Sequence, residues 1–198
     1  PGGGSGEGGR DAHYANGKYA VYPGNNFNAH LIPFTNGAFK LNGKTKMASA
    51  VMPYYTISWN QDKVNNENIA NNYNKYLITD LLRKKYKYDG VVCTDWLVTG
   101  DHKAMDNFVD GKPFGVEHLS IAERHYKILM AGVDQFGGNN DAKPVIEAYQ
   151  MGVKEWGEAT MRARMEQSAV RLLLNIFRVG LFENPYADAA VTKATVGK

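Results

Sequence analysis

Asp95 and Trp96 follow a short continuous apolar run formed by Val91, Val92 and Cys93, with Thr94 between the run and Asp95. Such a run is typical of a strand that is buried on both faces of a parallel sheet. A carboxylate at the carboxyl end of a buried parallel strand lies where the active sites of α/β barrels are built, and an indole offers a flat apolar face that suits a sugar ring. An aspartate at this position can also cap the next helix, so these residues alone leave both interpretations open.

A second group with possible chemistry lies in the glycine-dense residues 1–17, which also carry Arg10, Asp11 and His13. Composition alone favours a flexible linker, and a lone loop histidine is commonly a surface residue. Charged side chains on a glycine-rich loop can, however, approach the hydroxyl groups of a ligand closely. A phosphate cradle fits poorly, because no buried strand precedes these glycines.

The elements that must position these residues alternate between strands and helices. Strands are predicted at residues 48–52, 91–93 and 133–136, and helices at residues 27–41, 66–86, about 119–130 and 158–179. The helix at residues 66–86 ends in basic residues, which suit the negative end of the helix dipole. This alternation predicts parallel strands joined by crossover helices. Tyr54 and Tyr55 follow the first strand and would lie at the same face as Asp95, where they could also simply pack.

Composition excludes several classes of protein. A net charge of +3, from 23 basic and 20 acidic residues, is too mild to indicate a nucleic-acid partner, and no apolar run is long enough to span a membrane. The single cysteine, Cys93, excludes an internal disulfide and is read as a small buried hydrophobe. No metal-ligand spacing is recognisable. The chain opens on Pro1 without a Met or a signal peptide, so its true beginning is expected elsewhere.

Five stretches, in order along the chain, together resemble glycoside hydrolase family 3. The string from Tyr88 to Trp96 resembles the nucleophile motif of the family, with Thr94 where serine is common. The other four stretches are Pro1 to Gly4, Val51 to Tyr55, Ala131 to Asp134 and Arg178 to Tyr186. The Lys-His-Phe string of the family is absent from this chain.

The resemblance implies an α/β fold that is part of a (β/α)8 barrel of the TIM type. Because a complete barrel needs eight strands and about 250 residues, the chain is expected to supply about three parallel strands with their crossover helices. Residues 1–186 would form the C-terminal half of the barrel domain, and residues 187–198 the start of an interdomain linker. The missing barrel half and a C-terminal domain of the same protein would be its structural partners.

The activity that the resemblance implies is exo-acting, retaining hydrolysis of a β-linked glycoside or oligosaccharide, of the β-glucosidase type. Asp95 would be the nucleophile. The implied substrate-binding residues are Tyr55, Trp96, Arg10, Asp11 and His13. No metal or cofactor is implied, and a periplasmic or secreted location is favoured. The sugar, the linkage and the acid/base residue remain open.

Two alternatives stay open. The chain could be an inactive barrel fragment that needs the rest of the protein. It could also belong to an enzyme like the N-acetylglucosaminidase branch of the family, in which a related Asp-x-His pair supplies the general acid/base. Asp11 and His13 have that spacing.

Overall fold

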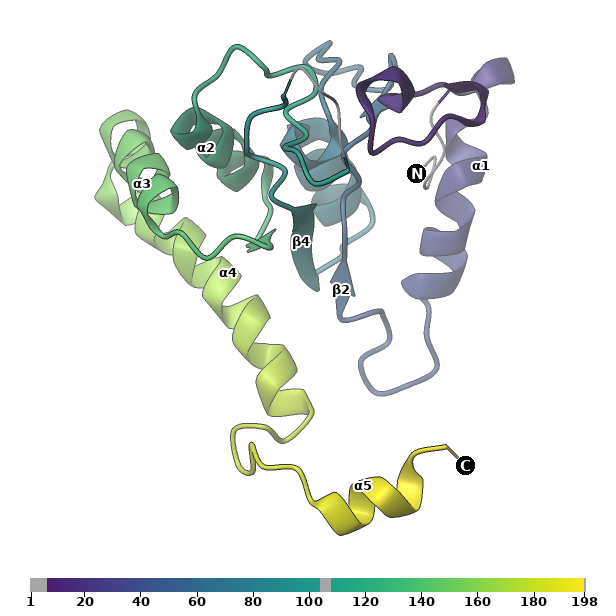
Figure 1. Ribbon diagram of the computed structural model, residues 1–198, viewed down its shortest axis with the longest axis vertical. Helices are drawn as coiled ribbons and strands as arrows, with labels where there is room; N and C mark the ends of the chain where they lie inside the picture. The colour runs from purple at the N-terminus through teal and green to yellow at the C-terminus, as the bar shows by residue number, and fades with distance from the viewer. Residues whose placement is uncertain (1–6, 104–107, 198) are drawn as a thin grey trace.

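The computed structural model describes residues 7–103 and 108–197. Its centre is a three-stranded parallel sheet in the order β2-β4-β5, made of β2 (Ala50–Val51), β4 (Val91–Trp96) and β5 (Gln135–Gly137). Ala50 pairs with Val91, and Cys93 pairs with Gln135. Strands β2 and β4 lie side by side in the middle of the molecule, with helices around them (Figure 1). The parallel α/β arrangement predicted from the sequence is confirmed.

The observed strands differ in extent from the predicted ones. Strand β2 has only two residues, and β5 begins at Gln135 instead of Val133. Strand β4 continues past Cys93 to Trp96, because its end still pairs with Gly137 of β5. Asp95 therefore lies inside β4, one residue before the end of the strand, and not in the loop that follows.

A second parallel sheet joins β1 (Tyr19–Ala20) to β3 (Ile57–Ser58). The backbone N–H of Ile57 donates to Lys18 O over 2.7 Å, and that of Trp59 donates to Ala20 O over 2.9 Å. Each strand has two residues, which is too short to produce a readable alternation in the sequence. The sequence did not predict this pair.

The helices surround the sheet. The longer ones are α1 (Phe27–Ile32), the π-helical η4 (Pro33–Ala38) and η6 (Tyr76–Lys85), α2 (Ile121–Ala131), α3 (Lys143–Trp156), α4 (Glu158–Arg178) and α5 (Ala189–Thr195). Single turns form η1 (Glu7–Gly9), η2 (Ala15–Gly17), η3 (Pro23–Asn25) and η5 (Asn71–Tyr73).

The helix predicted at residues 66–86 starts ten residues late, at Tyr76. The backbone N–H groups of Ala70 and Asn71 donate to Phe114 O and Thr56 O, so tertiary contacts hold this segment out of a helix. The helix predicted at residues 158–179 ends at Arg178, and Gly180 terminates it as expected, with a φ of 74° and Leu181 N donating back to Ile176 O.

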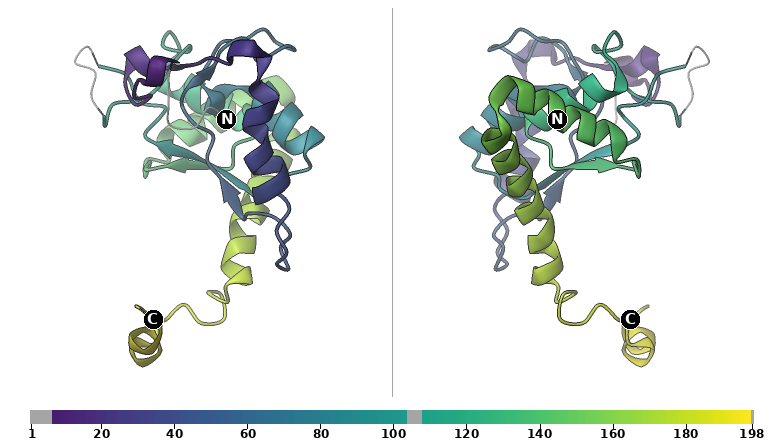
Figure 2. Two further views of the ribbon diagram at one scale, coloured as in Figure 1. Left: turned by 90° about the vertical axis from the view of Figure 1, so that its right-hand side faces the viewer. Right: turned by 90° about the vertical axis from the view of Figure 1, so that its left-hand side faces the viewer.

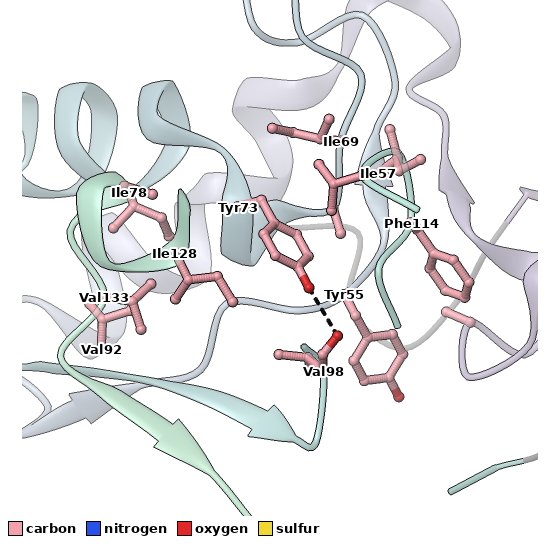
Figure 3. Packing of buried hydrophobic residues seen from close by; sticks show 14 of the residues in the cluster. Tyr55, Ile57, Ile69, Tyr73, Ile78, Val92, Val98, Phe114, Ile128 and Val133 are labelled. Atoms are coloured by element: carbon pink, nitrogen blue, oxygen red, sulfur yellow. Dashed lines mark hydrogen bonds between the residues drawn. The ribbon is translucent and has the colours of Figure 1, made fainter. Parts of the chain in front are cut away.

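The main core packs the sheet against η5, α2 and the loops that follow β2 and β4. Figure 3 shows Val92, Ile128 and Val133 on one side of this core, with Tyr55 and Phe114 on the other. The hydroxyl of Tyr73 donates to Val98 O over 2.9 Å within it, which satisfies a buried polar group. A buried tyrosine thus holds the backbone that follows β4 in place.

The C-terminal part of the chain projects from this body. Helix α4 runs away from the sheet, and α5 lies beyond its end, apart from the other elements in all views (Figures 1 and 2). The described part of α4 exposes the large apolar side chains Val170, Leu173, Ile176 and Phe177. No helix among residues 7–103 and 108–197 is both long and apolar enough to cross a membrane.

Candidate active site

Strand β4 carries an irregularity at Thr94 and Asp95. Between the pairs Cys93–Gln135 and Trp96–Gly137, β4 advances three residues while β5 advances two. This extra residue is a β-bulge, a feature that re-aims side chains and recurs next to active sites. Leu97 follows with a φ of 50°, a conformation that is rare for leucine and that concentrates at functional sites.

Thr94 and Gly137 fix the bulge. The N–H of Gly137 donates to Thr94 Oγ1 over 2.9 Å, and Thr94 Oγ1 in turn donates to Asp95 O over 2.9 Å. A Cβ atom built on Gly137 would lie 2.4 Å from Thr94 O and 2.7 Å from Asp95 O. Only glycine lets β5 approach the bulge this closely, so Gly137 sets the direction in which Asp95 leaves the strand.

The carboxylate of Asp95 is partly exposed. Within the described part of the chain it accepts no hydrogen bond and forms no ion pair. Its charge still reaches its neighbours. Burial, and secondarily the negative charge of Asp95, raise the pKa of the Cys93 thiol. The Asp95 carboxylate is therefore a free acceptor at the carboxyl end of the central strand.

Tyr54 and Tyr55 form a tilted ring pair close enough for the charge of Asp95 to act on both. Their ring centroids lie 4.1 Å apart, and the Tyr55 hydroxyl donates to the Tyr54 hydroxyl over 3.0 Å. Burial is the main cause that raises the pKa of Tyr55 far above its ordinary value, followed by Tyr54 and then by the charges of Asp95 and Asp11. Two carboxylates from distant parts of the chain thus act on one buried tyrosine.

Asp11 and His13 form a hydrogen-bonded pair on the N-terminal loop. The Oδ1 atom of Asp11 lies 2.7 Å from His13 Nδ1 and accepts the backbone N–H of His13 over 2.9 Å. These two hydrogen bonds lower the pKa of the Asp11 carboxyl. The His13 ring lies 5.1 Å from the Tyr55 ring and stacks on Phe108 at 4.1 Å. The loop histidine is therefore held against the tyrosine pair and not left in solvent.

Arg10 and Trp96, the remaining predicted site residues, are the sequence neighbours of Asp11 and Asp95 but make other contacts. Arg10 is exposed, one residue before Asp11, and its guanidinium lies over Gly8. Trp96 is 69% exposed, and its indole lies against Gly138 in the loop after β5.

The sequence did not single out Phe108 as part of this region, and it assigned no structural role to Thr94 or Gly137. Their signal was present only as a threonine in a motif, a glycine after a strand and an aromatic in a polar loop. No group of three or more His, Cys, Asp and Glu side chains in the described ranges could hold a metal ion.

Comparison with known proteins places this arrangement in a family. The family model described as the glycosyl hydrolase family 3 N terminal domain matches residues 3–174. A periplasmic β-glucosidase/β-xylosidase of Dickeya chrysanthemi is 38% identical over 98% of this chain and 30% of its own length. β-Glucosidase C of Emericella nidulans is 37% identical over 100% of this chain and 29% of its own. The chain belongs to glycoside hydrolase family 3.

Solved structures agree on the fold. A β-glucosidase involved in saponin metabolism from intestinal bacteria superposes with a TM-score of 0.64 at 24% identity, covering 100% of this chain and 22% of that chain. A β-glucosidase of Erythrobacter marinus gives a TM-score of 0.62 at 22% identity, covering 96% and 21%. The chain thus spans about a third or less of the length of these relatives.

Proposed function

We propose that the protein carrying this chain is an exo-acting, retaining β-glycoside hydrolase of the β-glucosidase type, with Asp95 as its nucleophile. One observation carries the proposal: the only carboxylate on the central strand β4 lies at its carboxyl end, at a bulge, without a hydrogen-bond partner in residues 7–103 and 108–197. A free carboxylate at this place can approach a bound sugar. The β-glucosidase relatives support the substrate class.

In this mechanism an Asp95 oxygen attacks the anomeric carbon as the glycosidic bond breaks, and the leaving oxygen takes a proton from a general acid. Water then attacks the covalent glycosyl-enzyme, gives its proton to the same group and releases the sugar with its configuration retained. The second carboxyl must lie about 5–5.5 Å from Asp95. Tyr55, Trp96, Arg10, Asp11 and His13 would bind the substrate around this centre.

The chain supplies part of that enzyme. Residues 1–186 would form the C-terminal half of a (β/α)8 barrel and residues 187–198 the start of a linker. In the described residues β2 and β5 each pair only with β4, which leaves an edge of each for neighbouring strands. The rest of the barrel and a C-terminal domain are the proposed partners, and the periplasmic relative from Dickeya chrysanthemi supports an exported protein.

The test is covalent trapping on the full-length protein. A 2-fluoro-β-glucoside should label the peptide that contains Asp95, and Asp95→Asn should abolish labelling and lower turnover by several orders of magnitude. Asp80→Asn, which changes a carboxylate paired with Lys84 on η6, is the matched control and should behave like wild type. Labelling of another residue, or near-normal turnover of Asp95→Asn, would refute the assignment.

A second candidate has its own observation. The 2.7 Å contact between Asp11 Oδ1 and His13 Nδ1, with the imidazole packed on Tyr55, fits a general acid/base in an N-acetylglucosaminidase-like enzyme. In that case His13→Gln should slow glycosides with poor leaving groups far more than activated aryl glycosides. The full-length protein should also prefer an N-acetylglucosaminide to the corresponding glucoside. Equal slowing of all substrates and a preference for the glucoside would decide for the first proposal.

A further inference from the structure

The amino ends of β4 and β5 carry a charged cluster that the candidate active site does not use. At its centre is Asp134, whose side chain is 0% exposed. Its Oδ2 atom accepts from Arg83 Nη2 over 2.5 Å, and its Oδ1 atom accepts from Ser168 Oγ over 2.7 Å and Arg171 Nη1 over 3.1 Å. Arg164 Nη1 lies 3.8 Å from the same oxygen. Three guanidinium groups therefore converge on one buried carboxylate.

The same arginines hold the backbone that leads into the strands. Arg83 Nη1 donates to Tyr88 O over 3.1 Å and to Gly90 O over 2.6 Å, immediately before β4. Arg164 donates to Leu129 O over 3.0 Å and to Val133 O, at the entry to β5. Arg83 comes from η6 and Arg164 from α4. The cluster thus ties two helices to the starts of two strands.

Asp134 also joins the strands directly. The N–H of Val92 donates to Asp134 Oδ2 over 3.0 Å, and the N–H of Asp134 donates to Val92 O over 2.8 Å. Val92 lies three residues before Asp95, or about 10 Å along an extended strand. Both hydrogen bonds fix the register of β4 against β5. The bulge at Asp95 depends on that register.

The charge of Asp134 is what holds the cluster together. The three arginines are largely buried, and among the described residues the only carboxylate besides Asp134 that balances them is the exposed Asp89, which pairs with Arg171. Burial lowers the pKa of Arg164 to about 10, and Asp134 opposes that shift. A neutral side chain at position 134 would leave three like charges close together in a site with little water.

We propose that Asp134 is a positioning residue for the candidate active site, acting through β4 on the placement of Asp95. The inference rests on the proposed function for its kinetic consequence only. Asp134 and its arginine partners fix the register of β4 at its amino end. Gly137 and Thr94 then fix the bulge at its carboxyl end.

The test compares Asp134→Asn with wild type in the full-length protein. Asparagine keeps the shape and an acceptor for Val92 N–H but removes the charge. Because a small misplacement of a reacting group is costly, kcat for an aryl β-glucoside should fall about 10- to 100-fold with KM little changed. Labelling of the Cys93 thiol, followed on its peptide by mass spectrometry, should accelerate as the β4–β5 pairing loosens.

Glu123→Gln is the matched control, since it removes a structural carboxylate from the capping box of α2 without touching β4. It should lower the thermal midpoint but leave kcat and Cys93 labelling unchanged. If Asp134→Asn does the same, the positioning role is refuted and the cluster is only a stabilising one.

Ser168→Ala removes one hydrogen bond to Asp134 and provides a milder variant if Asp134→Asn does not fold. As in Asp134→Asn, the Cys93 labelling rate should rise and kcat should fall, both by less. Unchanged values would count against the proposal. If wild type hydrolyses no β-glycoside, the proposed function fails, while Cys93 labelling still decides whether Asp134 holds β4.

Discussion

The hydroxyl of Tyr55 donates a 3.0 Å hydrogen bond to the hydroxyl of Tyr54. The family resemblance implies that a tyrosine at position 55 contacts the nucleophile, whereas here Asp95 acts on it through its charge. Burial raises the pKa of Tyr55 far above its ordinary value, so its phenol stays protonated even in alkaline solution. Tyr55 is therefore a permanent donor, and within the described residues its hydroxyl donates to Tyr54 and not to Asp95.

Tyr55→Phe and Tyr54→Phe should accordingly differ. Loss of the Tyr55 donor should lower kcat about 10-fold with a smaller change in KM, because the hydrogen bond would orient Asp95 in the reacting state. Tyr54→Phe removes only the competing acceptor and should leave kcat within about twofold of wild type. Steady-state kinetics on the full-length protein measure both, and equal losses would show that the pair only packs.

Gly137→Ala should displace the bulge. The new methyl group would meet Thr94 O at 2.4 Å, so β4 and β5 must separate. We expect a loss of about 1–3 kcal/mol in the free energy of unfolding, as for other overpacked sites, together with a fall in kcat. Gly43→Ala is the control, because nothing lies within 4 Å of its added methyl group. A Gly137→Ala protein with normal kinetics and stability would show that the bulge is not fixed by this contact.

The stability of the protein should fall in mild acid because of His125. This imidazole is 0% exposed, and burial lowers its pKa below the ordinary 6.5, against the opposing effects of Ile121 O and Asp141. Thr99, Asn139 and Phe136 complete its surroundings. Below about pH 6.5 the unfolded chain binds a proton that the folded chain refuses, so the stabilisation is present above that pH and is lost as the pH falls towards the folded pKa.

Chemical denaturation of the full-length protein between pH 5 and 8 measures this slope. His125→Gln should flatten it, because the titrating group is removed, whereas His118→Gln, at an exposed position, should leave it unchanged. An unchanged slope in His125→Gln would assign the acid sensitivity to other groups.

Residues 1–198 alone should not form a stable, active monomer. Both outer strands have an edge without a strand partner in the described residues, and α4 exposes a row of large apolar side chains. An apolar cavity of about 290 Å³ between α1, η6 and β2 adds further uncovered surface. Sedimentation should show association, and denaturation a broad transition. A cooperative monomeric transition with glycosidase activity would overturn this prediction.

The sequence was most informative where one short stretch contained the whole signal. The apolar run of β4, the periodic stripe of α4 and the glycine that ends it needed no distant partner to be recognised. The β1–β3 pair and the bulge at Asp95 could not be predicted, because each depends on a pairing with residues about 40 positions away. Asp95 was thus located without the geometry that aims it.

The charged cluster shows the same limit. The basic end of η6 suggested exposed cations near the helix dipole, yet the Arg83 side chain is turned inward to Asp134, 51 residues further along the chain. Lys84, its neighbour, behaves as expected and pairs with Asp80 on the helix surface. Arg83 and Lys84 are both basic residues in the last turn of η6, so the sequence does not distinguish them. Only the fold shows that one is buried and the other is exposed.

The exposure of Trp96 has a consequence for spectroscopy. The other two tryptophans, Trp59 and Trp156, are also 40% and 53% exposed, so the intrinsic emission of the native chain already reports a watery environment. Unfolding should shift its emission maximum very little. The buried rings of Tyr55, Tyr73 and Tyr88, each 1% exposed, make near-ultraviolet circular dichroism the signal that follows loss of the core. Tryptophan emission is then left free to report what occupies the surface around Trp96.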